Sequence, residues 1–145
     1  MNIRLAKHSD VKKIANLLEQ AFSKRDAESA KKEIKEMFSR SVIRPTYVVA
    51  VEDHKIVGVA GFIQSWFDYQ VYEIFWVAVK PEVQGMGIGK RMINDVVVRI
   101  RELKRNSKAQ AIVLTTETPA FFMKCGFEKI SKLPGIRYLM IRNLK

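Results

Sequence analysis

Hydrophobic side chains recur along this chain with two spacings, one typical of amphipathic helices and the other of strands. Helical spacing of the apolar positions predicts long helices over 11–22, 27–40 and 88–103, and Thr118-Pro119 is expected to open a short one. Short runs rich in β-branched and aromatic residues predict strands over 2–6, 47–52, 56–65, 71–79, 111–116, 127–132 and 136–142. The chain therefore alternates between the two classes of element.

The connections between these elements predict how the strands pair. A tight turn at residues 53–55 makes a hairpin of the second and third strands, and another short turn leads into the strand at 71–79. That strand, the long helix after it, a turn at Asn106–Lys108 and the strand at 111–116 form a β-α-β unit, whose strands are expected to be parallel. These connections predict an α+β domain over residues 1–145 with a mixed, mostly antiparallel sheet.

The stretch from Val71 to Leu103 carries the candidate chemistry. Its first nine residues, VYEIFWVAV, predict a strand buried on much of both faces, and Pro81 ends that strand. Three glycines then alternate with other residues before the helix, in the loop Gln84–Lys90. A helix start carries unpaired backbone N–H groups, and glycines let an anion approach them. The loop therefore predicts a phosphate or pyrophosphate site.

Known glycine motifs narrow this interpretation. The spacing lacks the third glycine of the dinucleotide-binding fingerprint and the four-residue gap of the P-loop. An ordinary strand-to-helix turn is the remaining alternative, although three glycines are more than a turn needs. Q-x-x-G-x-G does fit, at Gln84, Gly85, Met86, Gly87, Ile88 and Gly89, and V-x-V-x-P precedes it at Val77, Val79 and Pro81.

Together these residues closely resemble the acetyl-CoA-binding motif of the GNAT acyltransferase superfamily. The segment FFMKCGFEKI is similar to the Y-x-x-x-G-F segment of the same family, and the order of elements also matches. The resemblance implies a GNAT-type fold, with a sheet of six to seven strands and about four flanking helices. It also implies acetyl-CoA as cosubstrate, without a metal.

The resemblance assigns the cofactor contacts mostly to the backbone. Val77, Ala78 and Val79 would pair with the pantetheine arm, and the N–H of Val77 would hold the acetyl carbonyl and its developing oxyanion. The pyrophosphate would be bound by main-chain N–H groups of the loop, those of Gly85, Met86, Gly87, Ile88, Gly89 and Lys90. Gln84 stands at the first position of the motif.

Two side chains bear on catalysis. Glu73 is the only charged residue of VYEIFWVAV, four residues before Val77, and in this family a glutamate at that offset can be the general base. An edge-facing or ion-paired glutamate is the structural alternative. Phe122 stands where the family often has a tyrosine that protonates the departing thiolate. Tyr138 and Cys125 are the nearest alternative proton donors along the sequence. The surroundings of Cys125 favour a small buried thiol over a nucleophile.

The function these features predict is transfer of an acetyl group from acetyl-CoA to a primary amine, by direct attack in a ternary complex. The alternative is a non-catalytic acyl-CoA sensor or a basic, nucleic-acid-associated module, because the chain carries a net charge of +11. The positive charge is spread along the chain, without a known nucleic-acid-binding signature, which makes a nucleic-acid partner the weaker choice.

The acceptor is less well defined by sequence. The spacing in TTETPAFFMKCGF is similar to the shorter form of N-acetylglutamate-synthase-like members, which favours a small amino-bearing metabolite. A polyamine would need a local acidic pocket, for which Glu73, Asp68 and Glu117 are the candidates. Trp66, Phe67 and Tyr69 are expected either to wall the acceptor site or to cap the core.

The remaining expectations concern the cellular location of the protein and its partners. The lack of a signal peptide or of a long apolar run, together with a single cysteine, predicts a cytoplasmic protein without a membrane partner, and a homodimer is compatible with these features.

Overall fold

The computed structural model describes residues 1–103 and 108–144. Most of the turn expected at Asn106–Lys108 lies outside the described residues. The helices are α1 (Val11–Ala21), α2 (Lys24–Lys35), α3 (Ile88–Glu102) and α4 (Pro119–Met123). The strands are β1 (Asn2–Leu5), β2 (Thr46–Glu52), β3 (Lys55–Gln64), β4 (Val71–Val79), β5 (Ala111–Thr116), β6 (Glu128–Lys132) and β7 (Tyr138–Asn143).

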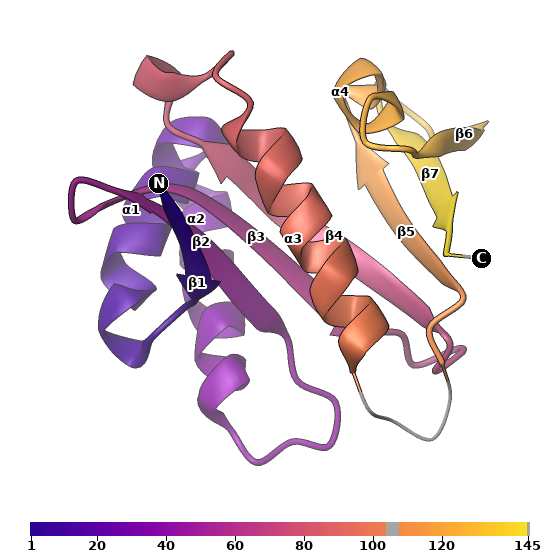
Figure 1. Ribbon diagram of the computed structural model, residues 1–145, viewed down its shortest axis with the longest axis horizontal. Coiled ribbons are helices and arrows are strands. Elements are labelled where there is room, and N and C mark those ends of the chain that lie inside the picture. The colour runs from indigo at the N-terminus through magenta and orange to yellow at the C-terminus, as the bar shows by residue number, and fades with distance from the viewer. Residues whose placement is uncertain (104–107, 145) are drawn as a thin grey trace.

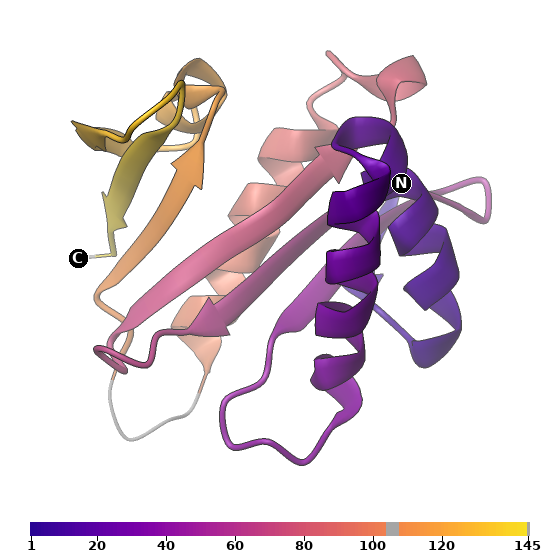
Figure 2. The ribbon, with the colours of Figure 1, turned by 180° about the vertical axis from the view of Figure 1, so that it is seen from behind.

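These strands form one seven-stranded sheet in the order β1-β2-β3-β4-β5-β7-β6. Every neighbouring pair is antiparallel except β4 and β5, which are parallel as the β-α-β unit predicts. Helix α3 crosses the face of the sheet nearest the viewer in Figure 1, and α1 and α2 cover the opposite face, seen in Figure 2. The mixed, mostly antiparallel sheet with four helices confirms the expected α+β fold.

Each face of the sheet has its own hydrophobic core. On one side, Met92, Ile93, Val96 and Ile100 of α3 are at most 1% exposed and pack against the sheet. On the other, apolar side chains of α1 and α2 fill the second core, among them Ile14, Leu18 and Ile34. The helical spacing in the sequence thus places one apolar stripe of each helix against the sheet.

Strands β4 and β5 pair over only three residues each, Val71–Glu73 with Ala111–Val113. Beyond them the two strands diverge, as both ribbon views show (Figures 1 and 2). Both faces of β4 still contribute side chains to the two cores, as its apolar sequence predicts, although most of these side chains are only half-buried. Only Tyr72, Ile74 and Ala78 are buried, because the divergence leaves one edge of β4 facing open space.

A β-bulge marks the place where β4 leaves β5. On β3, Gly61 pairs with Phe75 and Val59 pairs with Ala78, so three steps along β4 match two steps along β3. Trp76, which lies within this interval, has a φ of +50°. A bulge adds one residue to a strand and so inverts the alternation of its side chains. Phe75 and Trp76 therefore both face the α1–α2 side, and Val77 faces the α3 side.

Two helix starts differ from the expected ones. Helix α2 begins at Lys24 rather than Ala27, because the hydroxyl of Ser23 accepts the N–H of Asp26 and caps the first turn. Its regular part ends at Lys35, and a 3-10 turn follows over Glu36–Phe38. The start of α1 also differs from the expectation, which was a side-chain cap by Ser9 or Asp10.

The carboxylate of Asp10 makes no capping bond into α1. It accepts the N–H of Lys7 at 2.7 Å and two guanidinium N–H groups of Arg4, at 2.7 and 3.2 Å. The hydrogen bond from Arg4 holds the pKa of Asp10 below its usual range. This contact fixes the connection between β1 and α1.

Replacing Asp10 by asparagine should destabilise the fold by about 2 kcal/mol at neutral pH, because a buried, charge-assisted contact is lost. A depressed pKa in the folded state means that the stabilisation is present above the unfolded pKa and is lost as the pH falls through the folded value. Urea unfolding should therefore show a difference that shrinks below about pH 4. Asp53→Asn, in an exposed turn, is the control, and equal midpoints for the two variants would contradict this account.

Candidate active site

The loop after β4, the first turn of α3 and the helix α4 enclose a cavity of about 520 Å³, called here the glycine-loop cavity. It contains nine of the ten residues that sequence assigned to cofactor binding: Val77, Ala78, Val79, Gln84, Gly85, Gly87, Ile88, Gly89 and Lys90. Met86 is the exception. Its side chain is 71% exposed and does not line the cavity, so any contact from Met86 would come from its backbone.

The loop owes its shape to three local features. Gly85 and Gly87 both have φ of +81°, a conformation that other residues adopt only with strain. Gly87 is the residue before α3, and no side chain caps the N–H groups of the first turn. Gln84 donates its side-chain amide to the carbonyl of Val79 at 3.0 Å and so ties the loop to the end of β4.

Gly89 is needed for a different reason, the close packing of α3 against α4. A β-carbon at this position would lie 2.9 Å from the ring of Phe121. The lack of a side chain at Gly89 thus brings α4 up to the loop and closes the cavity. No carboxylate is among the lining residues, whereas Lys90 and Lys124 are, so the cavity suits an anion. Lys124 was missed because only the fold brings α4 to the loop.

A second cavity, of about 570 Å³, occupies the space between the diverging strands and is called here the splay cavity. It shares three residues with the glycine-loop cavity, Val77, Thr118 and Phe122. The two spaces therefore adjoin at Val77. Asp26, Glu117 and Arg137 supply its ionisable groups. No pattern in the sequence predicts that Asp26 and Arg137 line a cavity, because they reach it from α2 and from the segment before β7.

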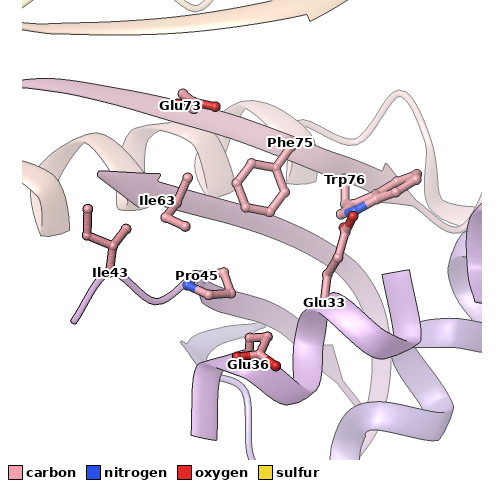
Figure 3. A pocket seen from close by; sticks show the side chains of 8 residues that line it. All are labelled: Glu33, Glu36, Ile43, Pro45, Ile63, Glu73, Phe75 and Trp76. Carbon is pink, nitrogen blue, oxygen red and sulfur yellow. The ribbon is translucent and has the colours of Figure 1, made fainter. Parts of the chain in front are cut away.

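A third cavity, of about 510 Å³, is called here the glutamate cavity and is shown in Figure 3. Its lining residues are Glu33, Glu36, Ile43, Pro45, Ile63, Glu73, Phe75 and Trp76. Glu73 is half-buried here rather than in the splay cavity, and Phe75 and Trp76 separate the two spaces by lining both. The indole N–H of Trp76 donates to the carboxylate of Glu33.

The acidic pocket expected from Glu73, Asp68 and Glu117 is therefore wrong in its membership. Asp68 accepts the N–H of Gln70 in the turn before β4, and Glu117 lines the splay cavity. The acidic residues that line the same cavity as Glu73 are Glu33 and Glu36, about 40 positions earlier in the chain.

The aromatic residues of the turn before β4 also lie elsewhere than expected. Trp66 and Phe67 are 73% and 78% exposed, and Tyr69 is half exposed. None of the three lines the three cavities, so they neither wall these spaces nor cap the core.

Phe122, at the family's tyrosine position, lies at the junction of the glycine-loop and splay cavities. It is 6% exposed and packs edge-to-face against Phe121 and Phe127. Tyr138 lines neither cavity and lies under the ammonium of Lys129. Cys125 does line the glycine-loop cavity, but burial raises the pKa of its thiol and so disfavours the thiolate form.

This arrangement matches a known family. A sequence profile of the acetyltransferase (GNAT) family matches residues 11–127. The chain belongs to the GNAT acetyltransferase family. A comparison with curated protein sequences gave no match.

Solved GNAT structures share the fold over nearly the whole chain. A putative acetyltransferase of the GNAT family from Desulfovibrio desulfuricans is 20% identical, with 99% of this chain and 98% of that chain covered and a TM-score of 0.83. A GNAT N-acetyltransferase from Escherichia coli, solved in complex with CoA, is also 20% identical, with 99% and 81% covered and a TM-score of 0.79.

The N-acetylglutamate synthase from Neisseria gonorrhoeae, complexed with CoA and N-acetyl-glutamate, is similar as well. Its sequence is 20% identical and its TM-score is 0.75, and the match covers 99% of this chain and 35% of that chain. At this identity the likeness shows the GNAT fold, and it is no greater than the likeness to the other two structures. Among the described residues, no helix is long and apolar enough to cross a membrane, and no three metal-binding side chains gather.

Replacing Gly87 by alanine should weaken CoA binding about tenfold, because strain at its positive φ displaces the N–H groups of the loop. Gly135 is a matched control, since it also has a positive φ, of +89°, with nothing within 4 Å of an added β-carbon. It lies outside the three cavities. Both variants should lose about 1–2 kcal/mol of stability. Calorimetric titration with CoA should separate them, and equal affinities would argue against the loop as the phosphate site.

Proposed function

We propose that this protein is an acetyl-CoA-dependent N-acetyltransferase that moves an acetyl group to a primary amine by direct attack. The observation that carries this proposal is the junction at Val77, where the glycine-loop cavity and the splay cavity meet. One cavity has cationic side chains and suits the anionic cosubstrate. The other opens on the opposite side of the junction and is free to admit an acceptor.

The path of acetyl-CoA follows from the unpaired edge of β4. Beyond Glu73 the pairing of this strand with β5 ends, so the segment Val77–Val79 has backbone groups on the open edge with which the amides of the pantetheine arm can pair, although Gln84 already donates to the carbonyl of Val79. The pyrophosphate would lie on the N–H groups of Gly85–Lys90. The N–H of Val77 would then stabilise the oxyanion that forms when the amine attacks the thioester.

Glu73 is proposed as the general base, acting through water. It is the only ionisable carboxylate on β4, and along the strand it lies roughly 13 Å from Val77, too far for direct contact with the attacking amine. Asp26 and Glu117 line the same cavity as Val77 and are the alternatives that the structure adds. Glu117 is exposed, which leaves Asp26 as the comparison for any test of Glu73.

The departing thiolate has no tyrosine beside it. Within the glycine-loop cavity, the side chains that could supply a proton are those of Lys90, Thr118, Lys124 and Cys125. We infer that the thiolate leaves with little assistance, because the thiol of CoA is a tolerable leaving group. The same absence gives weight to the second candidate function, a protein that binds acyl-CoA without turning it over.

The deciding experiment measures CoA release from acetyl-CoA against a panel of amines, amino acids and peptides, beside calorimetry with acetyl-CoA alone. Turnover with an amine is the expected result. With the best acceptor, Glu73→Gln should lower kcat/KM by about a hundredfold at neutral pH, and by less at high pH, where more of the amine is already deprotonated.

Asp26→Asn is the matched variant, and it should change kcat/KM less than Glu73→Gln does. Unchanged turnover in Glu73→Gln would remove that residue from the mechanism. Tight binding of acetyl-CoA without turnover of any acceptor would favour the sensor, and a lack of binding would refute both candidates.

Restoring the family's tyrosine provides an independent prediction. Phe122→Tyr should raise kcat by about three- to tenfold, because it places a proton donor at the junction where the thiolate forms. Phe127→Tyr adds the same hydroxyl to a ring that is 2% exposed and lines none of the three cavities. That control should lower the melting temperature and leave kcat unchanged. An unchanged or lower kcat in Phe122→Tyr, with the melting temperature kept, would contradict a need for a proton donor at this position.

A further inference from the structure

Two residues in the middle of β4, Trp76 and Val77, stand outside the pairing of the sheet. Neither has a Cα partner in β3 or β5, two strands that the structure describes throughout. The bulge places both opposite Ala60, and the pairing with β5 has already ended at Glu73. The peptide bond between them carries the N–H of Val77, the group proposed to stabilise the oxyanion. The direction of that N–H therefore depends on the backbone conformation of Trp76.

Trp76 has a backbone conformation that its bulky side chain does not favour. Its φ of +50° lies in the left-handed region, where such a residue is strained. The other described residues with positive φ, apart from glycines, are Asp53 and His54. They form the two-residue turn between β2 and β3, where this conformation is usual. Since strand pairing does not hold Trp76, contacts of its side chain must maintain the strain.

Both helices of the α1–α2 pair hold the indole of Trp76. Phe22, the residue after α1, packs edge-to-face on it with ring centroids 5.4 Å apart. From α2, the carboxylate of Glu33 accepts the indole N–H, and Figure 3 shows the side chain of Glu33 reaching from the helix to the ring. A hydrogen bond to an ionised acceptor is stronger than one between neutral groups and requires a particular direction. Glu33 thus adds a directional contact to the packing by Phe22.

Other contacts anchor the strand on both sides of the bulge. Before it, the ring of Phe75 packs edge-to-face on the buried ring of Tyr47, with centroids 5.8 Å apart. After it, Ala78 pairs with Val59 in β3. A change at Glu33 should therefore leave the course of β4 intact and act on the bulge alone.

We propose that Glu33 is a positioning residue for acetyl transfer. Its bond to the indole holds Trp76 in the left-handed conformation that directs the N–H of Val77 to the acetyl carbonyl. The inference rests on the proposed acetyl transfer and adds a side chain that lines neither the glycine-loop cavity nor the splay cavity. A donor stabilises an oxyanion only at hydrogen-bond distance, so a small rotation of this peptide should slow the reaction more than it weakens binding.

The first test observes the carbonyl group directly, in acetyl-CoA that is isotopically labelled at that carbon and bound without an acceptor. A hydrogen bond from Val77 should lower the infrared stretching frequency of the carbonyl relative to free acetyl-CoA. Glu33→Ala should lose most of this shift. Glu33→Gln keeps an oxygen that can accept the indole N–H and should retain it. Glu36→Ala removes a carboxylate from the same cavity but not the acceptor of the indole bond, and should also retain it.

Turnover with the best acceptor supplies the second test. Glu33→Ala should lower kcat about tenfold and change KM for acetyl-CoA by less than about twofold. Trp76→Phe keeps a ring but removes the donated N–H, so its loss of kcat should be similar. The double variant should be no slower than either single variant, because both remove the same bond. Glu33→Gln should keep kcat within about threefold of the unmodified protein.

The outcomes separate this inference from the transfer reaction itself. A carbonyl shift that persists in Glu33→Ala, or additive losses of kcat in the double variant, would overturn the inference and leave acetyl transfer intact. If no amine is acetylated but the shift is present and is lost in Glu33→Ala, the transfer reaction fails and the positioning of Val77 by Glu33 stands. A lack of acetyl-CoA binding, or of any shift, in the unmodified protein would overturn both.

Discussion

The early end of the pairing between β4 and β5 is the constraint on which the rest of this structure depends. A central strand normally has its backbone groups satisfied on both sides. Here β4 loses its β5 neighbour after Glu73 and runs on with one open edge. The fold tolerates this because α3 and the α1–α2 pair cover the two faces and hold β4 through side-chain packing instead. The open edge is then available to pair with a bound molecule.

The bulge at Trp76 divides this edge into two functional halves. Before the bulge, Glu73 and Phe75 face the α1–α2 side, and after it Val77 and Val79 face the α3 side. A bulky residue at positive φ is strained, and such strain persists only where the surrounding packing enforces it. Here it places two aromatic rings next to each other as the wall between the splay and glutamate cavities.

Charge is separated over the same short strand. Lysines alone supply the formal charge of the glycine-loop cavity, and glutamates alone supply that of the glutamate cavity. In a protein with a net charge of +11, the general field attracts an anionic cosubstrate. The glycine-loop and splay cavities meet at Val77 and Phe122, two residues without charge.

The helices and strands, their order and the glycine loop could all be predicted from the sequence. These depend on local physics: the periodicity of apolar residues, the turn residues, and glycines that alone accept a positive φ before α3. It also determined the family, because the loop motif is contiguous. It failed at the start of α2, where the Ser23 cap outweighs the hydrophobic pattern.

The packing of distant segments determines which carboxylates share a cavity with Glu73, and it places Lys124 and Asp26 in the cavities beside Val77. That packing alone also leaves β4 open along one edge. The physical reason is that strand divergence and the bulge arise from packing between segments far apart in the chain. Side-chain alternation is regular within a strand, and one inserted residue inverts it without any mark in the hydrophobic pattern.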